Sequence, residues 1–181
     1  MNQELWDKCV TFHGHECPGL AIGFRAAQIA MAKLGKPVNL ADSAAKDEEI
    51  VCVTENDACG VDAVQVLTSC TMGKGNLIYR PTGKMAFSFF CRNSGDKVRV
   101  VLKPKTDPDM SREDWQTYLL EAPADDAFSV TTPDFDLPEQ ARLFTSITCE
   151  VCGESAPEHM MRLQESQTVC LDCFKSYHRG W

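Results

Sequence analysis

Residues 13–19 read HGHECPG and place two imidazoles and a thiol directly before a pattern typical of a helix. Pro18 suits the first helical position, and apolar residues then recur at helical spacing until Gly35 interrupts them. We therefore predict a helix over about residues 18–34, with Cys17 at its N-terminus. The helix dipole and the free backbone N–H groups there favour a thiolate, so we expect Cys17 to ionise more readily than an ordinary cysteine.

The histidines and the cysteine of this stretch are candidate metal ligands. In an extended segment, the side chains of His13, His15 and Cys17 would point to the same side and converge. Imidazole and thiolate are ligands that zinc and late transition metals prefer. Taken singly, each residue is more often a packing residue, whereas the triplet favours a metal site. We expect Cys59, at the start of a second helix, to complete it, with Asp62 orienting a histidine or a metal-bound water.

The composition limits the class of protein. The 181 residues suffice for one sizeable domain and a small appendage, and an apolar fraction of 44% is ordinary for a globular chain. The first eight residues lack the apolar core of a signal peptide, and no run approaches the roughly 18 residues that cross a bilayer. We expect a cytoplasmic protein without membrane contact. A net charge of −8 argues against non-specific nucleic-acid binding.

Short apolar runs and periodic segments predict an α+β core with an antiparallel sheet and packed helices. The second helix carries Val61, Val64 and Leu67 on one face, and another helix is expected over residues 111–121. Strands are predicted at residues 50–53, 76–79, 84–91 and 97–103. The domain boundaries follow from a Pro- and Asp-rich stretch that holds one short strand candidate, at residues 128–131. They are a core domain over 1–122, a linker over 123–145 and a metal-binding module over 146–181.

The end of the second helix offers two further candidates for a core pocket. If that helix is continuous, Cys70 lies roughly 16 Å from Cys59, so the two thiols cannot share one metal ion. The loop at residues 73–76 reads GKGN and is either a tight turn into a strand or a weak anion cradle with Lys74 supplying charge. The candidate catalytic residues are therefore Cys17, Cys59, Cys70 and Lys74.

Ten cysteines suit either a secreted disulfide framework or metal binding, and the absent signal favours the latter. Two CxxC pairs lie seventeen residues apart near the C-terminus, a spacing typical of structural zinc. A hairpin between the pairs and one or two helical turns after the second would make a treble clef. Four thiolates close the zinc shell, so we expect folding energy rather than catalysis from it. The ligands are Cys149, Cys152, Cys170 and Cys173.

Two segments of the core resemble the FmdE family, named for a component of formylmethanofuran dehydrogenase. They are residues 12–21, FHGHECPGLA, and the pair CGVDAVQ at 59–65 with CTMGKGN at 70–76. The resemblance implies an α+β core, a homodimer and a C-terminal zinc finger that some members carry. It also implies that His15, Cys17, Cys59 and Cys70 cluster around a metal-holding pocket. The catalytic tungsten or molybdenum centre of the parent complex belongs to its other subunits, so the resemblance does not establish a dehydrogenase.

Three hypotheses follow for the function. The first is a metal-binding accessory protein associated with molybdenum or tungsten enzyme subunits or with one-carbon metabolism. The second is an enzyme in which His13, His15, Cys17 and Cys59 hold zinc or nickel with an open position, and Lys74 steadies an anionic substrate. The third is a metal-responsive regulator whose finger contacts nucleic acid, although acidic residues in the finger offset its positive charge and favour a protein contact.

Overall fold

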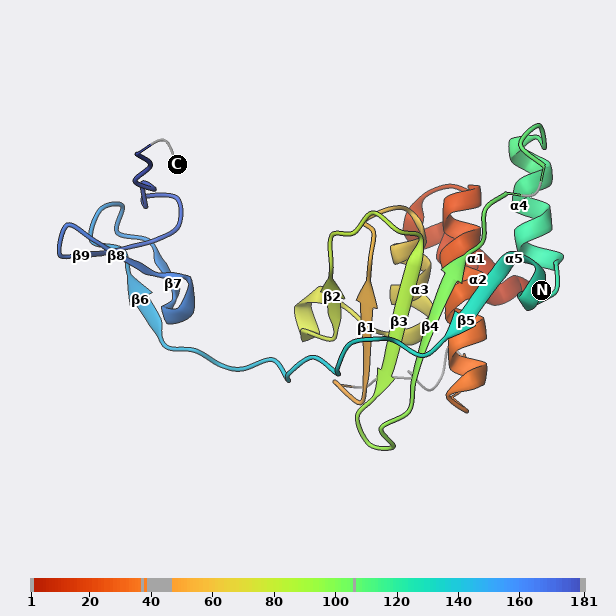
Figure 1. The fold of residues 1–181 in the computed structure, drawn as a ribbon, viewed down its shortest axis with the longest axis horizontal. Helices are drawn as coiled ribbons and strands as arrows, with labels where there is room; N and C mark the ends of the chain where they lie inside the picture. Colours follow the sequence, from red (N-terminus) through yellow and green to blue (C-terminus); the bar gives the residue numbers. More distant parts are fainter. Residues whose placement is uncertain (1, 37, 39–46, 106, 180–181) are drawn as a thin grey trace. The chain divides into compact units, whose positions relative to one another are not determined.

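The structure is a computed structural model that describes residues 2–36, 38, 47–105 and 107–179, and the chain divides into two compact units, Met1–Ala141 and Arg142–Trp181 (Figure 1). The first unit is an α+β domain in which helices pack against a five-stranded sheet, as predicted. Within the described ranges, no helix combines the length and the apolarity needed to cross a membrane.

The sheet has the strand order β2-β1-β3-β4-β5. All neighbouring pairs are antiparallel except β1 and β2, which are parallel, so the sheet is mixed rather than purely antiparallel. The parallel pair arises because a helix carries the chain from the end of β1 back to the start of β2. The strands are β1 (Ile50–Thr54), β2 (Leu77–Tyr79), β3 (Ala86–Cys91), β4 (Lys97–Leu102) and β5 (Phe128–Thr131).

The helices of this unit bury their apolar side chains against the sheet and against each other. The main apolar cluster joins residues of the first three helices to inward-facing residues of β1, β3 and β4. The helical segments are α1 (Gln3–His13), α2 (Pro18–Lys33), α3 (Gly60–Thr68), the short η1 (Met72–Lys74), α4 (Arg112–Glu121) and the single turn α5 (Ala124–Ala127).

Helix α1 was not foreseen from the sequence, and it changes the interpretation of residues 13–19. Asn2 caps the helix by accepting a hydrogen bond from the Leu5 backbone N–H at 3.2 Å, and Trp6 is 2% exposed. Gly14 ends the helix in the left-handed region, with φ 93°. The predicted extended segment is therefore wrong at its start, because His13 belongs to the last turn of a helix.

Helices α2 and α3 cross at unusually close range through glycine. A Cβ atom built on Gly23 would lie 1.8 Å from the carbonyl oxygen of Gly60, and one built on Gly60 would lie 2.9 Å from the Gly19 oxygen. Only glycine permits this approach, since any side chain would push the helices apart. The crossing brings the N-termini of α2 and α3 together.

The two units meet at residues 141 and 142, within the stretch predicted as a linker over residues 123–145. The strand candidate at 128–131 is present as β5, yet it pairs with β4 as an edge strand of the core sheet. Beyond it, Phe135 packs beside Phe90 with ring centroids 5.5 Å apart, and Arg92 donates to the Pro138 carbonyl at 2.8 Å. The core unit thus extends to Ala141 because backbone pairing and aromatic packing hold this segment to the sheet.

The second unit consists of two short hairpins. β6 (Ser146–Thr148) pairs with β7 (Ser155–Pro157), and β8 (Arg162–Gln164) pairs with β9 (Gln167–Val169). A single 3-10 turn, η2 (Glu158–Met160), joins them. The described residues 174–179 contain no helix, so the helical turns expected after the second cysteine pair are not seen there.

Candidate metal centre

Three helix ends converge on one point in the core unit. His13 is the last residue of α1, Cys17 is the N-cap of α2, and Cys59 is the N-cap of α3. One ligand atom from each of these residues lies within 4.8 Å of the other two. The structure therefore brings together three of the four side chains that the sequence suggested as core ligands.

Asp62 fixes the orientation of the histidine. The Nδ1 atom of His13 lies 2.7 Å from Oδ2 of Asp62, and the histidine side chain is only 11% exposed. When Nδ1–H donates to this carboxylate, the lone pair of Nε2 is free to bind a metal ion. The Nε2 atom lies 3.8 Å from Cys17 Sγ. A carboxylate behind a ligating histidine is a common arrangement in metal sites. The structure thus agrees with the orienting role predicted for Asp62.

The two thiols occupy different environments at their helix ends. Cys17 is 3% exposed, and its Sγ accepts a hydrogen bond from the Leu20 backbone N–H at 3.3 Å, as a capping side chain does. Cys59 makes no side-chain capping bond. Desolvation, followed by the hydrogen bond and the charge of Cys17, raises the pKa of Cys59 above its usual value. The thiolate expected at Cys59 from its helix position alone is therefore opposed by burial and by the neighbouring sulfur, and a bound cation would reverse that balance.

His15 does not belong to the cluster. Its ring lies against that of His13, with centroids 4.5 Å apart and planes inclined by 37°, and the residue is exposed. The left-handed turn at Gly14 removes the alternation that would have pointed His13 and His15 to one side. Among the described residues, the group that could hold a metal ion contains His13, Cys17 and Cys59 without His15.

Cys70 and Lys74 lie outside the cluster as well. Cys70 is fully buried beyond the C-terminal end of α3, where its thiol donates to the Ile50 carbonyl at 3.5 Å, and burial raises its pKa to about 11. In the loop, the Lys74 N–H faces the Thr71 hydroxyl at 3.4 Å, and the Gly75 N–H donates to the Met72 carbonyl. These two donors are engaged within the loop itself, which favours a tight turn into β2 over an anion cradle.

The comparison with protein families matches this core. A family model described as "FmdE, Molybdenum formylmethanofuran dehydrogenase operon" matches residues 12–132, which contain all three clustered side chains. The chain belongs to the FmdE family. The resemblance seen in residues 12–21 and 59–76 is thereby confirmed.

Two relatives place this FmdE protein among known chains. A crystal structure of a tungsten formylmethanofuran dehydrogenase FmdE-like protein from Syntrophus aciditrophicus superposes with a TM-score of 0.68 at 27% identity, covering 94% of this chain and 90% of that one. A probable S-adenosyl-L-methionine-binding protein from Archaeoglobus fulgidus is 33% identical over 195 aligned positions, covering 92% of this chain and 51% of that protein. The chain thus spans about half the length of this curated relative.

The second unit of the FmdE protein contains the four-cysteine cluster. The Sγ atoms of Cys149, Cys152, Cys170 and Cys173 all lie within 4.8 Å of one another. The Cys149 thiol accepts backbone hydrogen bonds from the Cys152 and Cys170 regions, which lower its pKa to about 6. Residues 142–179 match a family model described as a prokaryotic dksA/traR C4-type zinc finger. The predicted C-terminal zinc finger is confirmed, while its treble-clef form stays a prediction.

Sequence reasoning missed the residues that position the core cluster. A Cβ atom built on Gly19 would lie 3.1 Å from Cys59 Cβ and 3.7 Å from Cys17 Sγ. The absence of a side chain at Gly19 therefore leaves room for both thiols. Gly23 and Gly60 set the close helix crossing described above. The sequence does contain a signal for them: Gly19 follows Cys17 by two positions and Gly60 follows Cys59 by one. Glycine is ordinarily disfavoured within a helix, so its presence there indicates a special packing role.

Proposed function

We propose that the core of this protein binds a transition metal ion, zinc or nickel, through His13 Nε2, Cys17 Sγ and Cys59 Sγ. The observation that carries the proposal is that these three atoms lie within 4.8 Å of one another while Asp62 holds the histidine by Nδ1. A set of one imidazole and two thiols fits borderline-soft ions such as zinc, and three protein ligands leave one tetrahedral position for an outside ligand.

The role that we propose is that of a metal-binding accessory protein for molybdenum- or tungsten-dependent one-carbon chemistry. The family description refers to the molybdenum formylmethanofuran dehydrogenase operon, and the structural relative is described as like a component of the tungsten enzyme. A homodimer, with the finger available for contacts to the partner subunits, is part of the same proposal. Co-purification of an oxometallate enzyme with the tagged protein would support this role.

The three-ligand set also supports a second candidate function, that of an enzyme. Catalytic zinc sites use three protein ligands and keep the fourth position for water or substrate, and the bound ion then supplies Lewis acidity. An accessory protein and an enzyme would differ in whether they turn over a substrate, but both would have a free fourth coordination position on the core ion. In cobalt-substituted protein, added azide should therefore change the visible absorption of the core ion, whereas the four-thiolate finger should not respond.

The metal site itself is tested by metal analysis of purified protein. The wild-type chain should carry one more metal equivalent than the double variant Cys17→Ser, Cys59→Ser, which should retain the zinc of its finger. His15→Ala is the matched control, because this histidine lies beside the cluster without joining it, and it should keep the full complement. Equal metal content in the wild type and the double variant would contradict the core site.

A further inference from the structure

A charged pocket lies on the face of the sheet that the helices do not cover. Val51, Val53 and Phe90 form an apolar cluster separate from the main one, and Glu55 continues the alternation of Val51 and Val53 just beyond β1. In the sheet register, Val53 is opposite Ser88 on β3, which is opposite Arg99 on β4. Glu55 and Arg99 therefore share this outer face.

A buried ion pair forms the floor of the pocket. Arg99 Nε lies 2.6 Å from Glu55 Oε1, and the Thr82 hydroxyl donates to Glu55 Oε2 at 2.9 Å, while Glu55 is only 2% exposed. This pairing neutralises one arginine charge. Within the described ranges, the two terminal nitrogens of Arg99 have no hydrogen-bond partner, so they remain available above the pair.

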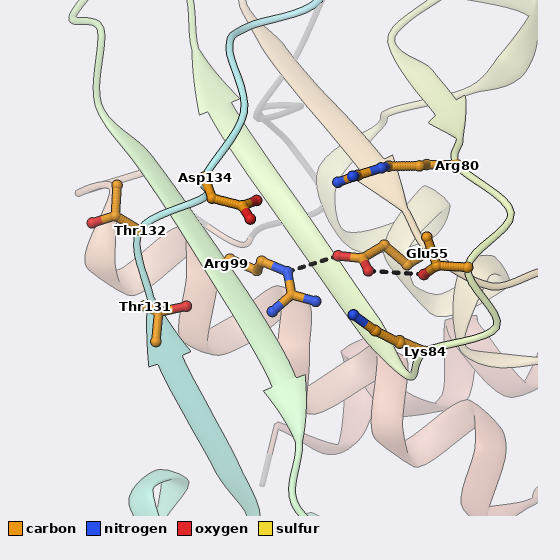
Figure 2. A pocket seen from close by; sticks show the side chains of 8 residues that line it. Glu55, Arg80, Lys84, Arg99, Thr131, Thr132 and Asp134 are labelled. Carbon is orange, nitrogen blue, oxygen red and sulfur yellow. Dashed lines mark hydrogen bonds and ion pairs between the residues drawn. The ribbon is translucent and has the colours of Figure 1, made fainter.

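Three more charged side chains surround the space above this pair. Arg80, Lys84 and Asp134 approach it from three directions, as Figure 2 shows. Arg80 also lies over the Phe135 ring, with 4.6 Å from its central carbon to the ring centroid. In the part of the chain that the structure describes, no ion pair joins Asp134 to either cation. Arg80 and Lys84 therefore keep their positive charges beside Asp134, around a cavity of about 250 Å³.

We propose that this pocket binds a small molecule carrying an oxyanion, a phosphate or a carboxylate, together with a neighbouring hydroxyl group. Arg80, Lys84 and the free edge of Arg99 bind the oxyanion, because guanidinium and ammonium groups form their strongest hydrogen bonds with charged oxygens. Asp134 accepts the hydrogen bond of the ligand hydroxyl. The volume is below that of most drug-sized sites, so the ligand is small.

The pocket is independent of the proposed metal centre. Its lining shares no residue with His13, Cys17 or Cys59, and it belongs to the sheet face opposite the helices that carry those ligands. Loss of the metal site would therefore leave the oxyanion site in place.

The charge of the pocket also differs from that of the whole chain. The chain has a net charge of −8, whereas this pocket has an excess of positive charge.

The test uses calorimetric titration of the full-length protein with three probes: inorganic phosphate, glycerol 3-phosphate and malate. Phosphate against malate distinguishes the two oxyanions. Arg80→Gln and Lys84→Gln should each weaken the bound probe about tenfold, as expected for a lost charge-assisted hydrogen bond. Arg112→Gln removes the same charge from an exposed position at the start of α4, and should leave affinity within about twofold of wild type.

Asp134→Asn tests the second half of the proposal. Without the carboxylate, the advantage of glycerol 3-phosphate over inorganic phosphate should shrink, while inorganic phosphate itself binds as well as before or better. Thermal unfolding of each variant shows whether it is folded, which is expected because Arg80, Lys84 and Asp134 are exposed. The proposal is overturned if no probe binds at millimolar concentration, or if Arg80→Gln and Lys84→Gln bind as tightly as Arg112→Gln.

Discussion

Replacing Gly23 by alanine should separate the two helices that hold the clustered thiols. The added Cβ would lie 1.8 Å from the Gly60 carbonyl oxygen, whereas an ordinary contact begins at 3.4 Å. Because the obstacle is backbone and not a flexible side chain, the helices must move apart by about 1.6 Å at the crossing. Overpacking of this kind costs about 1–3 kcal/mol of folding stability, and the clash here places Gly23→Ala at the upper end.

The same displacement should also weaken metal binding at the core cluster. Cys17 and Cys59 stand at the N-termini of these helices, and zinc–sulfur bonds of about 2.3 Å tolerate changes of about 0.2 Å. We expect the affinity of the core site, measured by competition with a chromogenic chelator, to fall at least tenfold, or about 1.4 kcal/mol. Urea unfolding of the same samples reports the stability change separately.

Gly73→Ala is the matched control, because a Cβ atom there meets nothing within 4 Å. It should change neither the chelator competition nor the urea midpoint. If Gly23→Ala binds the core ion as tightly as Gly73→Ala does, the close crossing does not position the thiols, and the account given for these glycines is refuted.

Three further predictions concern single side chains. Asp62→Asn should lower the affinity of the core site about 10–100-fold while leaving the finger zinc in place, as measured by chelator competition, because the amide no longer anchors His13 Nδ1 as a charged acceptor; an unchanged affinity would contradict the orienting role. Cys149→Ser should release the finger zinc and expose residues 142–181 to protease without lowering the melting temperature of the core, and a tail as resistant as wild type would count against zinc-dependent folding. Glu55→Gln should cost at most about 3 kcal/mol near neutral pH, because Arg99 loses its buried partner but stays 19% exposed. Hydrogen bonds from Arg99 and Thr82 outweigh desolvation and lower the pKa of Glu55 below its usual 4.5, so this contribution is present above that pH and is lost as the pH falls through the lower folded value. The stability difference between wild type and Glu55→Gln should therefore shrink in acid, and a difference that persists unchanged in acid would refute the assignment.

Local signals in the sequence predicted the elements that carry their own start and stop residues. Pro18 and the apolar repeat defined α2, and Ser111 was expected to cap α4, where its hydroxyl accepts the Asp114 N–H at 3.0 Å. Helix α1 gives a weaker local signal, because its few buried residues, among them Trp6, are dispersed in a polar segment. The spacing of these buried residues is nevertheless that of an amphipathic helix.

The candidate site depended on tertiary information that the chain does not display locally. His13 and Cys17 do come together, but not as neighbours on one extended segment, and His15 is not part of their group. Their actual proximity comes from a helix end and a left-handed glycine followed by a second helix start. Cys59 was found because an N-cap position favours a cysteine ligand, yet its distance from Cys17 is set by a helix crossing that only paired glycines allow.

The two cysteine clusters of the protein differ in what a bound metal ion would contribute to the fold. The finger has a minimal apolar core, centred on Val169 and two of its own cysteines, so zinc binding supplies most of its folding energy. The core unit packs large side chains such as Trp6, Phe24 and Phe89 into a continuous cluster that needs no ion. Cys17 is a buried member of that cluster and Cys59 packs against it, but apolar packing alone does not require both sulfurs to lie beside the His13 ring nitrogen, whereas metal ligation does. The arrangement of the core cluster is therefore better explained by ligand binding than by stability, and the core should stay folded without the proposed ion.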